Sequence, residues 1–172
     1  LTKNLELIKC RTVDLEVPTT SEIVLEGKLL SGERAQEGPF ADITETYDTV
    51  REQPVLKVET ITRREDTIYP AILPGSVEHQ LLMGTPREPI IFEEVNRVAK
   101  AKNVALTPGG CGWLHAVVSI EKEDEKDAEK AIEAAFRGHS SVKHVVIVDE
   151  DIDVYNSREV EWAIATRFRA DE

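Results

Sequence analysis

The spacing of apolar residues changes part-way along this 172-residue chain, and this change constrains the fold more than any other feature. In the first half, polar and apolar residues alternate, which predicts β-strands with one face toward a core. We predict four strands, at residues 12–17, 22–30, 54–62 and 67–73. Turns containing Gly or Pro are predicted at 31–33 and 37–39, and short strands separated in this way favour a small barrel or sandwich.

After Gly84, helical spacing of apolar residues joins the strand pattern. Thr85, Pro86 and Glu88 match a helix start, with a capping Thr, a Pro at the first position and a Glu three residues after the cap. Helices are predicted at 86–102, at 124–137 and from Ser157 onward, and strands at 103–106, 113–120 and 142–148. This alternation predicts an α/β layer. The predicted fold class is therefore α+β, with a β segment over residues 1–84 and an α/β segment over 85–172.

Composition excludes several classes of function. The chain has 33 acidic and 21 basic residues and a formal net charge of −12, which argues against sequence-independent binding to nucleic acid. No apolar run approaches the ~18 residues of a membrane span, so no membrane association is expected. Cys10 and Cys111 are far apart, which indicates neither a disulfide framework nor a Cys-based metal site. A reducing, cytoplasmic setting is the expectation.

Two carboxylates, Glu37 and Asp42, lie five residues apart around a Gly38–Pro39 bend. In a helix or a strand this spacing puts them on different faces, so only an irregular loop can bring them together. Paired carboxylates raise one pKa, which allows a carboxylic acid to carry a proton at neutral pH. The alternative interpretation is a solvated acidic loop.

Other candidate sites each have a structural alternative. The loop 107–112 (TPGGCG) could bind an anion through its backbone N–H groups, or could be a structural turn with Cys111 as a small buried residue. Residues 149–153 have the Asp spacing of a calcium loop, but Val154 occupies the position that requires Gly, which favours capping of secondary structure. The four histidines show no metal-ligand spacing. His79 follows a Leu-Pro-Gly loop and could face the same cavity as the acid pair.

Six blocks of sequence run in order through the chain: DLEVP at 14–18, EIVLEG at 22–27, EGPF with the following acid at 37–42, TPGGC at 107–111, VVIVDEDIDV at 145–154 and EWAIATR at 161–167. Together they resemble the UbiD family of non-oxidative decarboxylases. This resemblance implies a split β-barrel of the FMN-binding type followed by an α/β domain. It also implies prenylated FMN as cofactor, with a divalent metal (Mn or Mg) and potassium, and a flavin prenyltransferase as cofactor supplier.

The resemblance further implies an acid–arginine–acid trio. Two of its members fall on Asp42, as the proton donor, and on Glu37, as the residue that positions the arginine. The arginine and the metal ligands of the family lie upstream of the EIVLEG block, and a cofactor-contacting lysine lies beyond the last block. We therefore expect this chain to be a segment of a longer, oligomeric enzyme, with most cofactor contacts and the metal ligands outside it, and to be inactive alone.

The segment 73–84 (LPGSVEHQLLMG) most resembles archaeal members, which are linked to decarboxylation of anhydromevalonate phosphate in isoprenoid synthesis. The expected substrate-side residues are Ile43, His79, Met83 and Arg87, of which His79 or Arg87 could contact a phosphate. Glu45 replaces a Gly found in many members, which leaves substrate choice open. The alternatives are an aromatic acid such as a polyprenyl-4-hydroxybenzoate as substrate, or a non-catalytic scaffold of the same fold.

Overall fold

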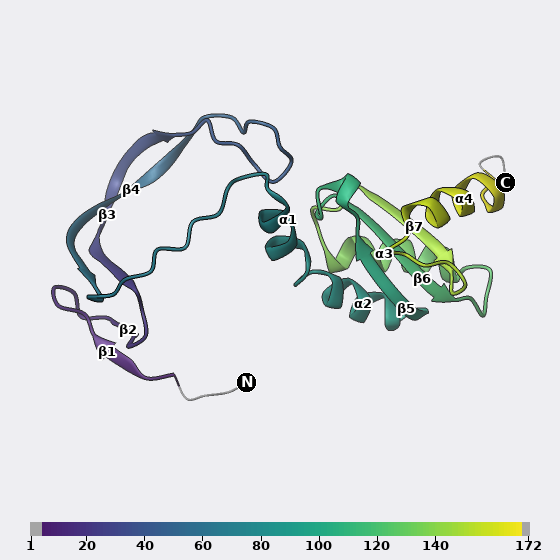
Figure 1. The fold of residues 1–172 in the computed structure, drawn as a ribbon, viewed down its shortest axis with the longest axis horizontal. Coiled ribbons are helices and arrows are strands. Elements are labelled where there is room, and N and C mark those ends of the chain that lie inside the picture. The colour runs from purple at the N-terminus through teal and green to yellow at the C-terminus, as the bar shows by residue number, and fades with distance from the viewer. Residues whose placement is uncertain (1–4, 170–172) are drawn as a thin grey trace. The chain divides into compact units, whose positions relative to one another are not determined.

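The computed structural model describes residues 5–169, which divide into two compact units (Figure 1). The first unit runs up to Phe40 and resumes over Tyr47–Ile72. The second consists of Ala41–Thr46 and the residues from Leu73 onward. The division into domain segments 1–84 and 85–172 stays a prediction.

The first unit consists of two antiparallel strand pairs. Strands β1 (Leu7–Lys9) and β2 (Glu16–Pro18) form the short pair, and β3 (Ile23–Glu37) and β4 (Arg51–Arg63) form a long hairpin (Figure 1). The hairpin contains the strands predicted at 22–30 and 54–62. The strand predicted at 12–17 is limited to its last two residues, 16 and 17, because the residues before them form a turn.

Two predictions in this unit are wrong. The turn predicted at 31–33 is an irregularity inside β3, where the pairing register shifts between Leu29 and Arg34 and Gly32 takes a positive φ of 77°. Gly accepts this conformation without a steric penalty, so β3 continues through it. The strand predicted at 67–73 does not form, since these residues pair with no strand.

Apolar side chains of the hairpin are exposed. The cross-strand partners Leu25 and Ile61 are 54% and 64% exposed, and Leu29 and its partner Leu56 are 71% and 47% exposed. Glu26 is the one buried residue among the described residues of this unit. The described strands form sheets of two, two and three strands, and none of these sheets closes into a barrel.

The second unit contains four α-helices, a single turn of 3-10 helix and three strands. In chain order these are α1 (Val77–Gly84), α2 (Glu88–Asn96), β5 (Lys100–Leu106), η1 (Pro108–Gly110), β6 (His115–Glu121), α3 (Asp127–Gly138), β7 (His144–Asp149) and α4 (Ser157–Arg167). The sheet order is β5-β6-β7, with β5 antiparallel and β7 parallel to β6. None of the described helices combines the length and the apolar character needed to cross a membrane.

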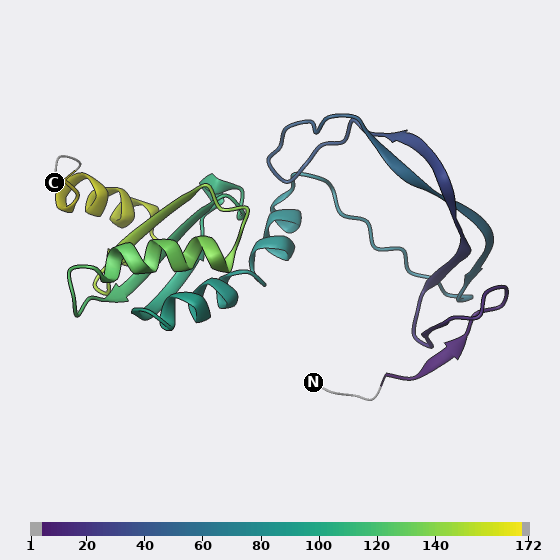
Figure 2. The same ribbon diagram turned by 180° about the vertical axis from the view of Figure 1, so that it is seen from behind.

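Successive residues of the sheet point to opposite faces, and each face has its own core. On one face, Val118 packs with Ile91 of α2 and Ala134 of α3, and these two helices lie side by side (Figure 2). On the other face, Val117 packs with Val160 of α4. This arrangement explains why residues 145–148 are all apolar: strand β7 is covered on both faces.

The helix start predicted at Thr85 is two residues too early. Thr85 follows the last residue of α1, where its backbone N–H donates to Leu81 O at 3.0 Å, and α2 begins at Glu88. Helix α1 itself was not predicted. It begins after Ser76, whose Oγ accepts a hydrogen bond from His79 N at 3.2 Å.

Candidate active site

Asp42 lies in a tight loop of the second unit. Its backbone N–H donates to Thr46 O at 2.9 Å, and Glu45 N donates to Asp42 O at 3.0 Å. The carboxylate Oδ1 of Asp42 accepts a hydrogen bond from Ile43 N at 2.7 Å. The Asp42 side chain is exposed, whereas Ile43 is 3% exposed. The buried Ile43 therefore anchors the loop and leaves the Asp42 carboxylate accessible.

Helix α1 and the residues before it contact this loop. Gln80 of α1 donates its side-chain N–H to Ile43 O and to the Glu45 carboxylate, both at 3.4 Å. A Cβ atom added at Gly75 would lie 3.3 Å from Asp42 O, so the chain before α1 passes close to the loop backbone. The predicted proton donor and the predicted substrate-side helix are therefore brought together within one unit.

His79, in the first turn of α1, has a defined orientation. Its ring Nδ1 accepts a hydrogen bond from Gly75 N at 3.1 Å. In the neutral ring the proton must then reside on Nε2, which makes Nε2–H a donor. Met83 lies one helical turn further on the same face of α1 and is 37% exposed. The structure thus places two of the predicted substrate-side residues on one face.

Glu37, the second predicted acid, is the last residue of β3 in the first unit. It pairs in register with Arg51 of β4, and its side chain is exposed. Glu37 and Asp42 therefore belong to different units. Their joint action stays a prediction.

The loop 107–112 is a packing element and not an anion cradle. The N–H groups of Gly110, Cys111 and Gly112 all donate to carbonyl oxygens inside the loop, at 2.9–3.0 Å. A Cβ atom at Gly84 would lie 2.1 Å from Gly112 O, so the end of α1 rests directly on this loop. Because these three N–H groups are paired within the loop, the structure favours the structural alternative for this motif, although Cys111 is only partly buried.

Arg87, the remaining predicted substrate-side residue, immediately precedes α2 and stacks on an aromatic ring. Its guanidinium carbon is 5.5 Å from the centroid of the Trp113 ring, and His139 meets the same indole edge-on, with centroids 4.2 Å apart. Trp113 and His139 were not singled out in the sequence, because their distance along the chain hides their contact. A Gly residue directly before each ring, Gly112 and Gly138, is the signal that could have indicated close packing there.

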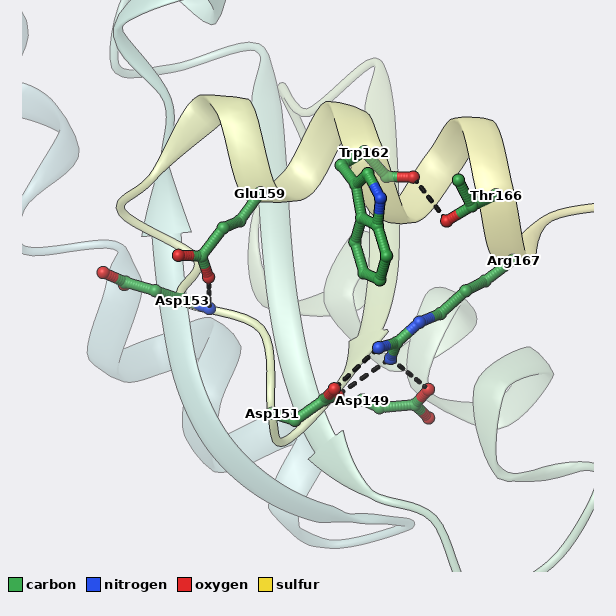
Figure 3. Close-up of polar contacts among 7 residues, drawn as sticks. All are labelled: Asp149, Asp151, Asp153, Glu159, Trp162, Thr166 and Arg167. Carbon is green, nitrogen blue, oxygen red and sulfur yellow. Dashed lines mark hydrogen bonds and ion pairs between the residues drawn. The ribbon is translucent and has the colours of Figure 1, made fainter.

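The acidic segment 149–153 binds a cation from within the chain. Arg167, in the last turn of α4, donates to Asp151 at 2.7 and 2.8 Å and to Asp149 at 3.1 Å (Figure 3). Its guanidinium also lies 5.0 Å from the centroid of the Trp162 ring. Arg167 lowers the pKa of the Asp151 carboxyl below its usual range through this hydrogen-bonded ion pair. The spacing that suggested a calcium loop is thus explained by an internal ion pair that joins the end of β7 to α4.

The described residues do not fit the metal that the family resemblance implies. Within residues 5–169, no group of three or more His, Cys, Asp or Glu side chains is placed to hold a metal ion.

The chain belongs to the UbiD family. Residues 1–77 match the family model described as the 3-octaprenyl-4-hydroxybenzoate carboxy-lyase Rift-related domain. Residues 80–172 match the C-terminal domain of the same carboxy-lyase. The two models together account for nearly the whole chain.

Similar proteins agree with this assignment. The chain is 54% identical over 169 residues to the anhydromevalonate phosphate decarboxylase of Methanothermobacter thermautotrophicus, covering 98% of this chain and 40% of that protein. A structure of an evolved dimeric form of the UbiD-class enzyme HmfF from Pelotomaculum thermopropionicum in complex with prFMN is 48% identical, with a TM-score of 0.92, covering 98% of this chain and 40% of that one. The apo 3,4-dihydroxybenzoic acid decarboxylase AroY of Klebsiella pneumoniae is 27% identical, with a TM-score of 0.86, covering 97% of this chain and 37% of that one. The chain thus spans about two fifths of the length of these relatives.

Proposed function

We propose that this chain is part of a decarboxylase that removes CO2 from anhydromevalonate phosphate, with prenylated FMN as cofactor, in isoprenoid synthesis. The observation that carries the proposal is the contact between the Asp42 loop and α1. This contact brings the segment of Asp42, whose carboxyl group can supply a proton, against α1, the helix that carries His79. The family membership and the 54% identity to an anhydromevalonate phosphate decarboxylase support the reaction type and the substrate.

Prenylated FMN, when bound, supplies the electron sink that makes loss of CO2 possible. Asp42 delivers a proton to the carbon atom that has lost CO2. The hydrogen bond from Ile43 N orients its carboxylate, and the tight loop restricts the motion of its backbone. Glu37 has the supporting role of positioning the arginine of the trio, which comes from the rest of the protein.

The phosphate of the substrate is bound by Arg87 and His79. Arg87 immediately precedes the nine-residue helix α2, where the helix dipole favours anions. Among the described residues, no carboxylate lies within ion-pair distance of the Arg87 guanidinium, so its charge remains available. The Nε2–H of His79 adds a second donor. Met83, which is 37% exposed, supplies apolar contact for the short carbon chain of the substrate, whereas the buried Ile43 holds the Asp42 loop in place.

The remaining parts of the enzyme lie in residues that the described chain does not supply. They include the metal ligands for Mn or Mg, the potassium site and most contacts to the flavin. A flavin prenyltransferase supplies this flavin in its prenylated form. The exposed apolar pairs of the β3–β4 hairpin support a split β-barrel completed by further strands. We place the enzyme in the cytoplasm as a homo-oligomer.

The test uses the full-length, cofactor-loaded enzyme and measures CO2 release. We expect turnover of anhydromevalonate phosphate, and little turnover of a polyprenyl-4-hydroxybenzoate. Arg87→Ala or His79→Ala should raise KM for the phosphorylated acid about 10- to 100-fold, since each removes a charge-assisted hydrogen bond to the phosphate. Arg158→Ala is the control, because it removes an exposed arginine of α4.

Three results would each contradict one part of the proposal. An unchanged KM in both variants would remove the phosphate role of Arg87 and His79. Preferred turnover of the aromatic acid would favour the alternative substrate class. A cofactor-loaded enzyme that releases CO2 from neither acid would favour the non-catalytic scaffold.

A further inference from the structure

Arg87, Trp113 and His139 come from three different parts of the second unit and form one stack. Arg87 precedes α2, Trp113 follows the loop 107–112, and His139 directly follows α3. The indole ring contacts both of the others: the guanidinium carbon is 5.5 Å from the ring centroid, and the imidazole meets the ring at an interplanar angle of 72°. An arginine over the face of a Trp ring is held by a cation–π interaction.

Backbone contacts fix the positions of these three residues. A Cβ atom added at Gly138 would lie 2.8 Å from Ile91 Cα, so the end of α3 lies directly against α2. Trp113 N donates to Gly110 O at 3.0 Å, which ties the indole to the loop. The stack is therefore held by packed backbone and does not depend on flexible side chains alone.

Within the stack, the electrostatic environment favours a charge on Arg87 and a neutral His139. His139 is 4% exposed, and its Nε2 has no hydrogen-bond partner among the described residues. Burial lowers the pKa of His139, the nearby charge of Arg87 lowers it further, and a backbone hydrogen bond with Trp113 acts in the opposite direction. A neutral imidazole can hold the indole without repelling the guanidinium.

We propose that Trp113 and His139 are positioning residues that hold the Arg87 guanidinium for the phosphate of the substrate. This inference rests on the proposed function. Arg87 has no carboxylate partner in the described part of the chain, so stacking can fix its position while its N–H groups stay free for a phosphate. The indole and imidazole therefore determine affinity for a phosphorylated acid without contacting the reacting carbon.

The first experiment measures steady-state kinetics of the full-length, cofactor-loaded enzyme with anhydromevalonate phosphate. Trp113→Leu should raise KM about 5- to 30-fold, the range expected for loss of a cation–π contact, with kcat within about twofold of wild type. Trp113→Phe retains an aromatic face and should restore most of the loss. His139→Phe should likewise cost less than His139→Ala, because it keeps a ring against the indole.

The matched control is Trp162→Leu. Trp162 stacks with Arg167 at 5.0 Å in the same unit, but carboxylates already pair with that arginine, so KM should not change. Should Trp113→Leu fail to fold, the cycle of Arg87→Ala, His139→Ala and their double variant tests the same positioning role. The His139→Ala substitution should raise KM in the wild-type background and have no effect on KM once Arg87 is absent.

A second readout is independent of activity. The emission of Trp113 in the full-length enzyme is obtained as the difference between the wild-type spectrum and that of the Trp113→Phe variant. Inorganic phosphate should change this emission, and Arg87→Ala should abolish that change. An unchanged KM in Trp113→Leu, together with a raised KM in Arg87→Ala, would overturn the positioning role and leave the proposed function intact. An unchanged KM in Arg87→Ala itself would instead remove the proposed phosphate contact.

Discussion

Glu26 illustrates how a single buried charge organises the first unit. Its carboxylate is 3% exposed and accepts hydrogen bonds from Arg11 N at 2.9 Å and from both the N–H and the Oγ1 of Thr12 at 2.6 Å. The hydrogen bond from Arg11 N is the largest cause of a pKa for Glu26 below its ordinary value. A carboxylate satisfied in this way ties the turn before β2 to strand β3.

We predict that Glu26→Gln loosens this turn. The Gln amide lacks the charge of the carboxylate and has half of its acceptor capacity. The N–H hydrogens of Arg11 and Thr12 should therefore exchange faster with solvent, as measured by NMR. Glu33→Gln is the control, because Glu33 is an exposed residue of the same strand. Equal exchange rates in Glu26→Gln and wild type would contradict this role.

The effect should also depend on pH in a defined direction. Because the folded-state pKa of Glu26 is depressed, its stabilisation is fully present above the ordinary glutamate pKa of about 4.3 and is lost as pH falls through the folded-state value. The gap in thermal midpoint between wild type and Glu26→Gln should therefore be large at pH 7 and shrink under strong acid.

At the scale of residues, the contact between two candidate site segments was predictable, whereas the burial of Glu26 was not. Family motifs mark Asp42 and His79, and the structure brings their segments together, while the roles of the two residues stay predictions. The burial of Glu26 could not be predicted, because an acidic residue in a strand usually faces solvent. Its burial depends on a turn some 14 residues away that folds around the carboxylate.

At the scale of elements, close backbone packing decides where α1 ends. The pattern beginning at Thr85 has the residues of a helix start, but Gly84 lies against Gly112, and the following residues turn before α2 begins. Helix α1 has no clear apolar face, since Leu81 and Leu82 are 59% and 56% exposed. Periodicity therefore could not reveal it, whereas α3, with periodic burial, and β7, with its run of apolar residues, were predicted nearly to their ends.

We predict that Gly84→Ala destabilises the second unit by about 1–3 kcal/mol, because the new methyl group would overlap the carbonyl of Gly112. Gly109→Ala is the matched control: it lies in the same region, but a Cβ there meets no atom within 4 Å. Denaturant unfolding followed by Trp fluorescence measures both variants. Equal stability of the two would mean that α1 does not rest on the loop as described.

At the scale of the whole molecule, the two units differ in how much the sequence could predict. The second unit buries both faces of its own sheet, so each local sequence pattern agrees with the environment that its residues have in the fold. The first unit leaves apolar cross-strand pairs exposed. Residues 67–73 have the sequence pattern of a strand, but they pair with no other described strand. A strand forms only where another strand satisfies its backbone, which local sequence does not report.

The proposed function also belongs to the whole molecule, since this chain spans about two fifths of its relatives. The most direct measurement is CO2 release by the full-length, cofactor-loaded enzyme carrying Asp42→Asn, with cofactor binding followed by absorbance. We expect turnover to be abolished while the cofactor still binds. The control Asp14→Asn, at a side chain that is 98% exposed, should keep normal turnover. Near-normal release of CO2 by Asp42→Asn would contradict the assignment of Asp42 as the proton donor.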